Sequence, residues 1–158
     1  MLTGFYMINI NVQDLDRSVE FYTRLGFAKV LEFGVDEPEV GQMFGLDDFG
    51  GLRFAWMKLE GARKGAPVLD LVEFGQPWVP ARDGNPRTRS GMARLSFRVD
   101  DIDAQYEYLR EMAVEFVVPL RRRIGPGGAP LAVMWFLDPD RTVIEVLQVG
   151  PKQGEQHG

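Results

Sequence analysis

The chain of 158 residues contains no cysteine and only one histidine, His157, which lies beside the C-terminal residue. Without cysteine there can be no disulfide bond, no thiolate catalysis and no cysteine-ligated zinc. His157 falls in a terminal stretch, residues 150–158, that has no apolar periodicity and is expected to be flexible. Side chains that usually bind transition metals are therefore scarce in this chain.

Long apolar runs and a strong charge of one sign are absent as well. No apolar segment approaches the ~18 residues that a membrane-spanning helix needs, and the N-terminus lacks the basic and apolar stretches of a secretory signal. The net charge of −5 disfavours a nucleic-acid backbone as partner. With a hydrophobic content of 45%, the sequence predicts a cytoplasmic globular protein with neither a membrane nor a nucleic-acid partner.

An internal repeat is the most informative feature that is present. The segment Val12-Gln13-Asp14-Leu15-Asp16 returns as Val99-Asp100-Asp101-Ile102-Asp103, 87 residues later. Such self-similarity indicates two copies of one supersecondary unit. We predict a single domain of residues 1–149, with repeats at 1–75 and 92–149 and a connector at 76–91.

Each repeat is predicted to contain a strand, a helix and three further strands. Period-2 alternation, helical spacing and turn residues support this order. The predicted strands are residues 7–12, 27–33, 52–59, 67–74, 94–99, 115–120, 131–136 and 142–147, with helices that begin near residues 15 and 102. Asp14 or Asp16 is expected to cap the first helix, and Asp101 or Asp103 the second. The predicted fold class is α+β, with two βαβββ repeats forming a curved mixed sheet around a cleft and the helices outside.

Polar residues alternate with apolar ones on the first strand of each repeat, and we expect the polar set to face the cleft. This set comprises Met7, Asn9, Asn11, Arg94, Ser96 and Arg98. Trp56 and Trp135 lie on equivalent strands, where they either stack on a planar ligand or fill the core. The run Arg121-Arg122-Arg123 is either a basic ligand patch or a solvated strand end.

Three segments carry a resemblance to a known family: Asn11 to Tyr22 with Leu25-Gly26-Phe27, Ser96 to Asp103, and Phe136 to Val146. In these segments the chain resembles the vicinal oxygen chelate superfamily, which includes glyoxalase I, extradiol dioxygenases and bleomycin-resistance proteins. The resemblance implies a divalent metal, which acts as a Lewis acid. By position its ligands would be Met7, Asp70, Arg94 and Glu145.

Two of these four positions are unsuited to a divalent metal. Met7 offers a soft thioether, and Arg94 is a permanent cation. Asp70 and Glu145 remain as candidate ligands, but we expect Arg94 to pair with them and to supply the positive charge instead. Arg94 is then either fully occupied or keeps one donor for a ligand oxygen. We therefore predict no cofactor and disfavour a metal.

Three functions follow from this comparison. The favoured one is a metal-independent binding protein of the bleomycin-resistance type, which holds a small organic ligand in a cleft between repeats or between the subunits of a homodimer. The alternatives are a metal-dependent lyase, isomerase or dioxygenase, and a degenerate regulatory or assembly module. No catalytic residue is assigned. The predicted ligand-binding residues are Met7, Asn9, Asn11, Trp56, Asp70, Arg94, Ser96, Arg98, Trp135 and Glu145.

Overall fold

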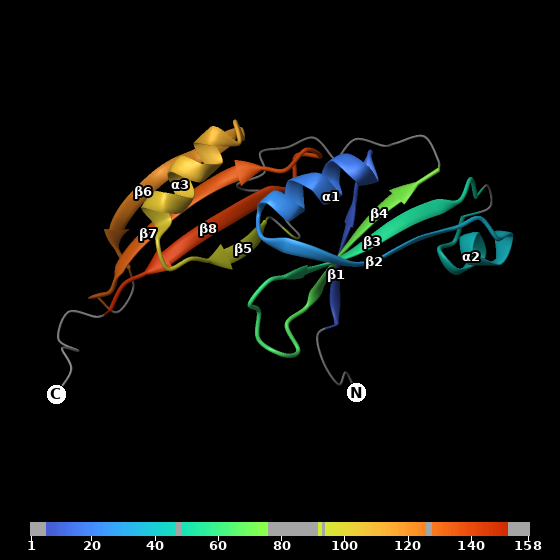
Figure 1. Ribbon diagram of the computed structural model, residues 1–158, viewed down its shortest axis with the longest axis horizontal. Coiled ribbons are helices and arrows are strands. Elements are labelled where there is room, and N and C mark those ends of the chain that lie inside the picture. The colour runs from blue at the N-terminus through green and yellow to red at the C-terminus, as the bar shows by residue number, and fades with distance from the viewer. Residues whose placement is uncertain (1–5, 47–48, 76–91, 93, 126–127, 152–158) are drawn as a thin grey trace. The chain divides into compact units, whose positions relative to one another are not determined.

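The computed structural model describes residues 6–46, 49–75, 92, 94–125 and 128–151 (Figure 1). The chain divides into two compact units, Met1–Ala81 and Arg82–Gly158. Each unit contains one four-stranded sheet, with the strand order β1-β4-β3-β2 in unit 1 and β5-β8-β7-β6 in unit 2. The predicted connector at 76–91 lies outside the described residues, as does the tail from residue 152 onward.

Unit 1 is built from β1 (Met7–Asn11), α1 (Leu15–Arg24), β2 (Phe27–Val35), α2 (Pro38–Met43), β3 (Leu52–Leu59) and β4 (Val68–Phe74). β1 is parallel to β4, whereas β3 runs antiparallel to both β4 and β2. Asp14 begins α1 by accepting a hydrogen bond from the backbone N–H of Arg17. After the helix, Gly26 has φ of +94°, a conformation that glycine adopts without strain.

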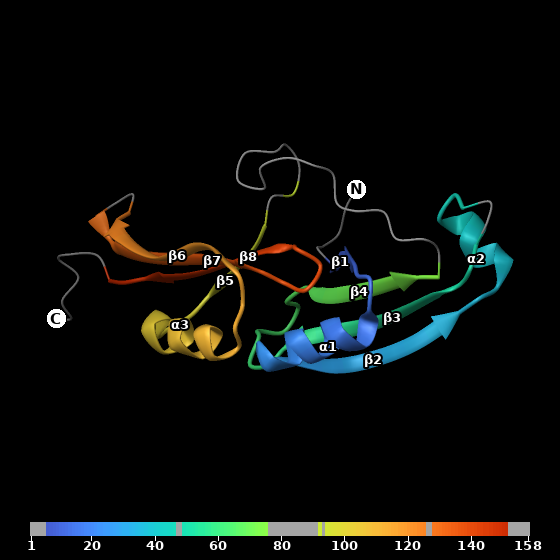
Figure 2. The ribbon, with the colours of Figure 1, turned by 90° about the horizontal axis from the view of Figure 1, so that it is seen from above.

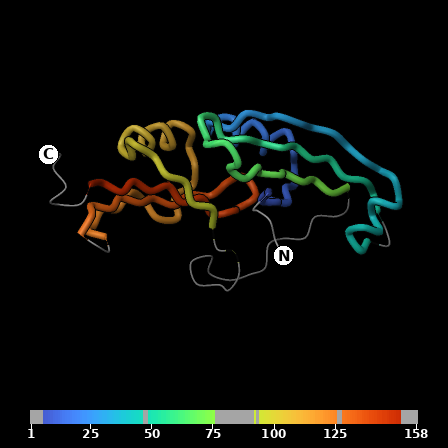
Figure 3. The backbone as a smooth tube through the Cα atoms, turned by 90° about the horizontal axis from the view of Figure 1, so that it is seen from below, coloured from blue at the N-terminus to red at the C-terminus, as the bar shows by residue number. Residues whose placement is uncertain are grey.

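Unit 2 repeats this order with β5 (Leu95–Arg98), α3 (Ile102–Glu111), β6 (Phe116–Ile124), β7 (Pro130–Leu137) and β8 (Val143–Val149). β5 is parallel to β8, and the other neighbouring pairs are antiparallel. Asp101 caps α3 by accepting from the backbone N–H groups of Asp103 and Ala104. Figure 3 traces the same succession along the tube, with β3 beside β4 and β7 beside β8.

In each unit the helix packs against one face of its own sheet (Figure 2). The core between them is apolar, with Leu71 and Met57 fully buried in unit 1 and Ile144 and Met134 fully buried in unit 2. We call the opposite side of each sheet its open face. Because successive side chains of a strand point to opposite faces, contacts with the helix identify which residues belong to which face.

The predicted fold class is confirmed, since both repeats contain the βαβββ order in mixed sheets. Each repeat forms a four-stranded sheet of its own. The enclosed cleft and the grouping of both repeats in one domain stay predictions. The short helix α2 was not predicted, because six residues are too few to show helical periodicity. The predicted end of the strand at residue 120 was wrong, since β6 continues through the three arginines to Ile124.

Candidate ligand-binding site

Each sheet has a row of three equivalent side chains, one from each of three neighbouring strands. In unit 1, Asp70 of β4 is paired with Asn9 of β1 and with Trp56 of β3. In unit 2, Glu145 of β8 is paired with Ser96 of β5 and with Trp135 of β7. Residues paired directly across a sheet point to the same face. Each unit therefore sets a carboxylate between a polar residue and a tryptophan.

Contacts with the helices show that both rows lie on the open faces. Glu73 accepts a hydrogen bond from the backbone N–H of Leu15 in α1, at 2.7 Å. In unit 2, Gln148 accepts from the backbone N–H of Ile102 in α3, at 3.3 Å. Glu73 and Gln148 are each three positions from Asp70 and Glu145, so the carboxylates point away from the helices. Asn9 of β1 and Ser96 of β5, from the polar sets predicted for the first strands, share these faces with the carboxylates. That the polar sets face a cleft stays a prediction.

Asp70 is a buried carboxylate with an incomplete set of partners. Its side chain is 9% exposed, and Trp56 is its hydrogen-bond donor. The second oxygen, Oδ1, is fully buried and has no hydrogen-bond partner among the described residues. Burial raises the pKa of Asp70, and the hydrogen bond from Trp56 opposes this rise without cancelling it. A buried acceptor without a donor costs roughly 1–3 kcal/mol, so Oδ1 is a favourable place for a donor group of a ligand.

Glu145 lies in an equivalent row but has a complete set of partners. Trp135 Nε1 donates to Oε1 at 2.8 Å, and the hydroxyl of Ser96 donates to Oε2. The Nε of Arg94 lies 3.1 Å from the same Oε2 in an ion pair. Burial alone would raise the pKa of Glu145, but Ser96, Arg94 and Trp135 together lower it below its ordinary value. Glu145 is therefore held as a compensated anion.

Arg94 contacts both Glu145 and Trp135. Its Cζ lies 4.4 Å from the centroid of the Trp135 ring, in a cation–π contact. The contact of the ion pair with Glu145 is made by Nε. The predicted ion pair between Arg94 and Glu145 is confirmed. The predicted contact between Arg94 and Asp70 would join the two units and stays a prediction.

Of the four positions implied for a metal, Met7 and Arg94 carry side chains unsuited to a divalent ion. Among residues 6–46, 49–75, 92, 94–125 and 128–151, no three His, Cys, Asp or Glu side chains are grouped closely enough to hold an ion. Met7 supplies only a thioether, and Arg94 places a positive charge against Glu145. His157 lies outside the described residues. The chemistry of these donors therefore does not fit the divalent centre that the resemblance implies.

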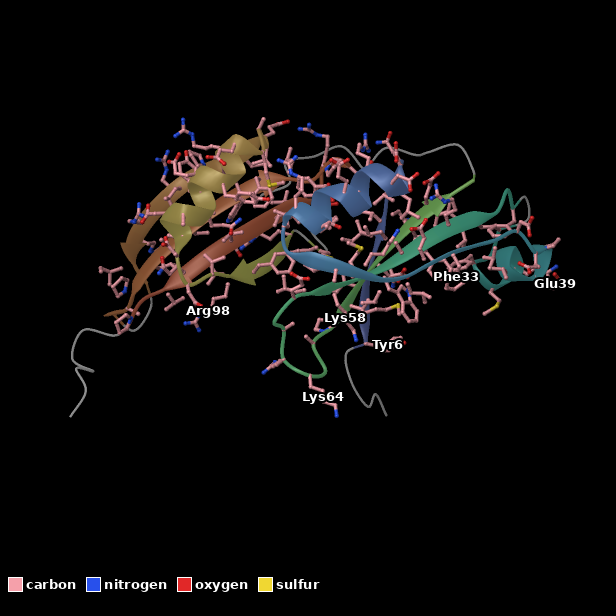
Figure 4. All side chains as sticks on the ribbon, viewed as in Figure 1. Tyr6, Phe33, Glu39, Lys58, Lys64 and Arg98 are labelled. Carbon is pink, nitrogen blue, oxygen red and sulfur yellow. The ribbon has the colours of Figure 1, made fainter. Side chains whose placement is uncertain are left out.

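Aromatic side chains share the open face of unit 1 with Asp70. Phe54 and Trp56 alternate along β3 with Arg53, which contacts α1, so both lie on the open face. Phe33 packs on Phe54 with ring centroids 3.7 Å apart, and Tyr6 meets Trp56 edge to face at 6.3 Å. Figure 4 labels Tyr6 and Phe33 on this unit. Of these aromatic residues only Trp56 was predicted from the sequence, although the period-2 spacing of β3 also places Phe54 on this face.

The remaining predicted residues occupy neighbouring rows. Met7 and Asn11 are paired with Val68 and Val72 of β4, on the same side of the sheet as Asn9. Arg98 is exposed and extends outward from the end of β5 (Figure 4). The structure therefore brings Trp56 to Asp70 in unit 1, and Arg94, Ser96 and Trp135 to Glu145 in unit 2.

Comparison with known proteins gives one family. A family model described as Glyoxalase/Bleomycin resistance protein/Dioxygenase superfamily matches residues 4–146. A lactoylglutathione lyase of Schizosaccharomyces pombe is 28% identical over 144 residues, which cover 87% of this chain and 45% of that protein. The chain thus spans less than half the length of this curated relative.

Solved structures share the fold. A glyoxalase family protein from Bacillus cereus has a TM-score of 0.78 at 20% identity, with 96% of this chain and 97% of that chain covered. A fosfomycin resistance protein from Listeria monocytogenes, solved with Mn(II) and sulfate, has a TM-score of 0.58 at 16% identity, with 94% and 93% covered. At these identities the likeness extends to the fold alone. In the part of the chain that the structure describes, no helix is long and apolar enough to cross a membrane.

Proposed function

Because the chain belongs to the Glyoxalase/Bleomycin resistance protein/Dioxygenase superfamily, we propose that it binds a small organic ligand and does so without a divalent metal. The observation that carries this proposal is the compensation of Glu145. Arg94, Ser96 and Trp135 satisfy the carboxylate that a metal would need as a ligand. A cation approaching Glu145 would have to displace an arginine that already contacts both the carboxylate and an aromatic ring.

The open face of unit 1 supplies what an organic ligand requires. Trp56, Phe54 and Phe33 offer apolar surface, and the buried Oδ1 of Asp70, in the row of Trp56, is an acceptor without a donor among the described residues. A ligand that donates a hydrogen bond or carries a cationic nitrogen would satisfy this acceptor, while its apolar part covers the rings. We infer that Asp70 anchors the ligand and that Trp56 orients the carboxylate through its hydrogen bond.

A metal-dependent lyase, isomerase or dioxygenase is the second candidate. Its support is the same oxygen of Asp70, which has no partner among the described residues, together with the lyase relative. The donor set argues against it, because Arg94 and Met7 stand where further ligands would be needed.

The decisive experiment measures metal content and ligand binding on the same purified protein. Elemental analysis should find less than stoichiometric Mn, Fe, Ni or Zn. A thermal-shift screen of aromatic amines and amides should find stabilising compounds, whose Kd by calorimetry is unchanged after EDTA treatment. Stoichiometric metal, or binding that EDTA abolishes and Mn²⁺ restores, would establish the second candidate instead. If neither metal nor any compound bound, the regulatory or assembly module would take its place.

Variants locate the binding site within this test. Asp70→Asn should weaken binding of the hits about tenfold, because the amide group cannot replace the anionic acceptor. Asp100→Asn, which removes an exposed carboxylate outside the open face of unit 1, is the matched control and should leave Kd unchanged. Equal effects of both substitutions would exclude Asp70 as the anchor.

A homodimer and a cytoplasmic location belong to the same proposal. Light scattering coupled to size-exclusion chromatography should give twice the chain mass of 17.9 kDa. A monomer at micromolar concentration would reject the dimer without affecting ligand binding to either open face.

A further inference from the structure

Arginines stand at both ends of one row across the open face of unit 2. Arg98 of β5 is paired with Leu147 of β8, Leu147 with Val133 of β7, and Val133 with Arg121 of β6. The row thus crosses all four strands, with two aliphatic side chains between two cations. Neighbouring strands lie about 4.8 Å apart, so the Cα atoms of Arg98 and Arg121 are separated by roughly 14 Å.

Contacts with α3 assign the three consecutive arginines of β6 to different faces. Arg122 forms an ion pair with Asp103 at 2.5 Å, so it lies on the helix side of the sheet. Arg121 and Arg123 are its direct neighbours in the strand and therefore lie on the open face. The register agrees, because Arg122 is paired with Ala132 and Ala132 with Gln148, which contacts α3.

Charge is separated between the two sides of unit 2. The four strands contain one acidic residue, Glu145, and Arg94 already compensates it. The acidic residues of α3 and its cap lie on the other side of the sheet: Asp101, Asp103, Glu107 and Glu111. In a chain with a net charge of −5, the open face of unit 2 is therefore locally positive.

The two terminal arginines of the row have no partner in the part of the chain that the structure describes. Arg98 and Arg121 are exposed, and neither forms an ion pair or a hydrogen bond with a residue that the structure describes. By contrast, Arg122 on the helix side is paired, as is Arg110 of α3 with Glu107. Unpaired guanidinium groups that flank an aliphatic strip are suited to carboxylate or phosphate groups joined by an apolar body.

We propose that the open face of unit 2 binds an organic dianion, with an apolar body on Leu147 and Val133 and acidic groups at Arg98 and Arg121. This inference rests on the proposed function and adds the chemical class of ligand for the second face. It is independent of Asp70, because every residue in the row belongs to unit 2.

The test uses straight-chain α,ω-dicarboxylates of four to twelve carbons as probes, with the full chain in low-salt buffer. Calorimetry should show binding that is tightest at one intermediate length. It should also be at least about tenfold tighter than for the monocarboxylate of equal length, because the second acid then meets its own arginine. A diamine of the same length should not bind this face.

Substitutions at the two ends of the row make the test specific. Arg98→Gln and Arg121→Gln should each weaken the best dicarboxylate about tenfold and remove the length preference. Arg110→Gln, which removes an arginine from α3, is the matched control and should leave Kd unchanged. Equal binding of mono- and dicarboxylates, or no effect of either substitution, would overturn the inference.

The outcomes separate this inference from the proposed function. If no dicarboxylate binds but compounds that need Asp70 still do, the inference fails and the proposed function stands. If both classes fail to bind, both proposals fall. A single-stranded oligonucleotide or anionic vesicles bound more tightly than any dicarboxylate, and released by Arg121→Gln, would identify a general polyanion surface and reject the small dianion.

Discussion

Arg94 lies over the indole ring of Trp135, with its Cζ 4.4 Å from the ring centroid, and both side chains contact the same carboxylate of Glu145. The three groups form a closed set in which each touches the other two. The arginine thereby brings a fixed positive charge to a position where the family resemblance implies a metal. This substitution of charge is the physical basis of the proposal that the site binds a ligand without an ion.

The coupling between Arg94 and Glu145 is measurable in a double-mutant cycle. Arg94→Met should lower the free energy of unfolding by about 2 kcal/mol, because a largely buried carboxylate loses its counter-charge. Glu145→Gln should lower the free energy of unfolding by less. The loss in the double variant should be about 1 kcal/mol smaller than the sum of the two single losses. Urea denaturation at pH 7 gives all four values. Strict additivity would show that the ion pair contributes nothing in solution.

Asp70 and Glu145 should respond to pH in opposite directions. Burial raises the pKa of Asp70 above its unfolded value of 3.8. Its favourable contribution is therefore present below that value and is lost as pH rises through the raised pKa. We expect Asp70→Asn to be more stable than the wild type at pH 7 by about 1 kcal/mol, with the advantage vanishing near pH 3. Chemical denaturation between pH 3 and pH 8 measures this difference.

Glu145 provides the internal control for that experiment. Its pKa is lowered from 4.5, so its contribution is present above this value and is lost as pH falls through the lowered pKa. Glu145→Gln should therefore be less stable than the wild type at pH 7 and approach it in acid. If Asp70→Asn also lost stability at pH 7, Asp70 would have a counter-charge in solution, and its role as a free acceptor would be rejected.

The sequence predicted backbone features well because the repeat and the alternation act locally. Alternation around Met7 and Leu95 placed the first strands, and aspartate before each helix predicted its cap. Geometry was needed to choose Asp14 over Asp16 and Asp101 over Asp103. In each pair only the first aspartate accepts hydrogen bonds from the first helical turn.

The arginines of β6 show where local reasoning ends. Arg121, Arg122 and Arg123 look equivalent in the sequence, but pairing with β7 sends the middle one to the helix side. Two register shifts earlier in β6, around Val118, prevent simple counting from Phe116. The partners of Asp70 and Glu145 were likewise hidden, because each set depends on strands that are distant in the sequence.

Arg53 joins three elements of unit 1 and should stabilise the attachment of α1. Its Nη2 lies 3.0 Å from both Asp16 of the helix and Glu32 of β2, and its Nη1 lies 3.7 Å from Glu73 of β4. We expect Arg53→Met to cost about 1 kcal/mol, since the network is partly exposed and screened by solvent. Hydrogen exchange in the first turn of α1 should accelerate accordingly.

Arg110→Met is the matched control for Arg53, because Arg110 forms only a local ion pair with Glu107 inside α3. The Arg110→Met variant should lose no more than about 0.5 kcal/mol in free energy of unfolding. Adding 1 M NaCl should shrink the difference between the two variants. If both variants lost the same stability at low salt, the three-way network around Arg53 would have no value beyond a single exposed pair.

Asp138 should be the most sensitive turn residue, because it sets the connection between β7 and β8. Its side chain is 5% exposed, and Oδ1 accepts from the backbone N–H groups of Asp140 at 3.0 Å and Thr142 at 2.7 Å. Asp138→Ala leaves both N–H groups without this acceptor and should cost about 2 kcal/mol in urea denaturation. Asp138→Asn keeps an oxygen acceptor and should cost less than half as much. The exposed cap variant Asp101→Ala should cost about 1 kcal/mol, because water can reach the amides that it leaves. Equal stability of Asp138→Ala and Asp138→Asn would show that the hydrogen bonds of this turn do not hold β8, and Glu145 with it, in register.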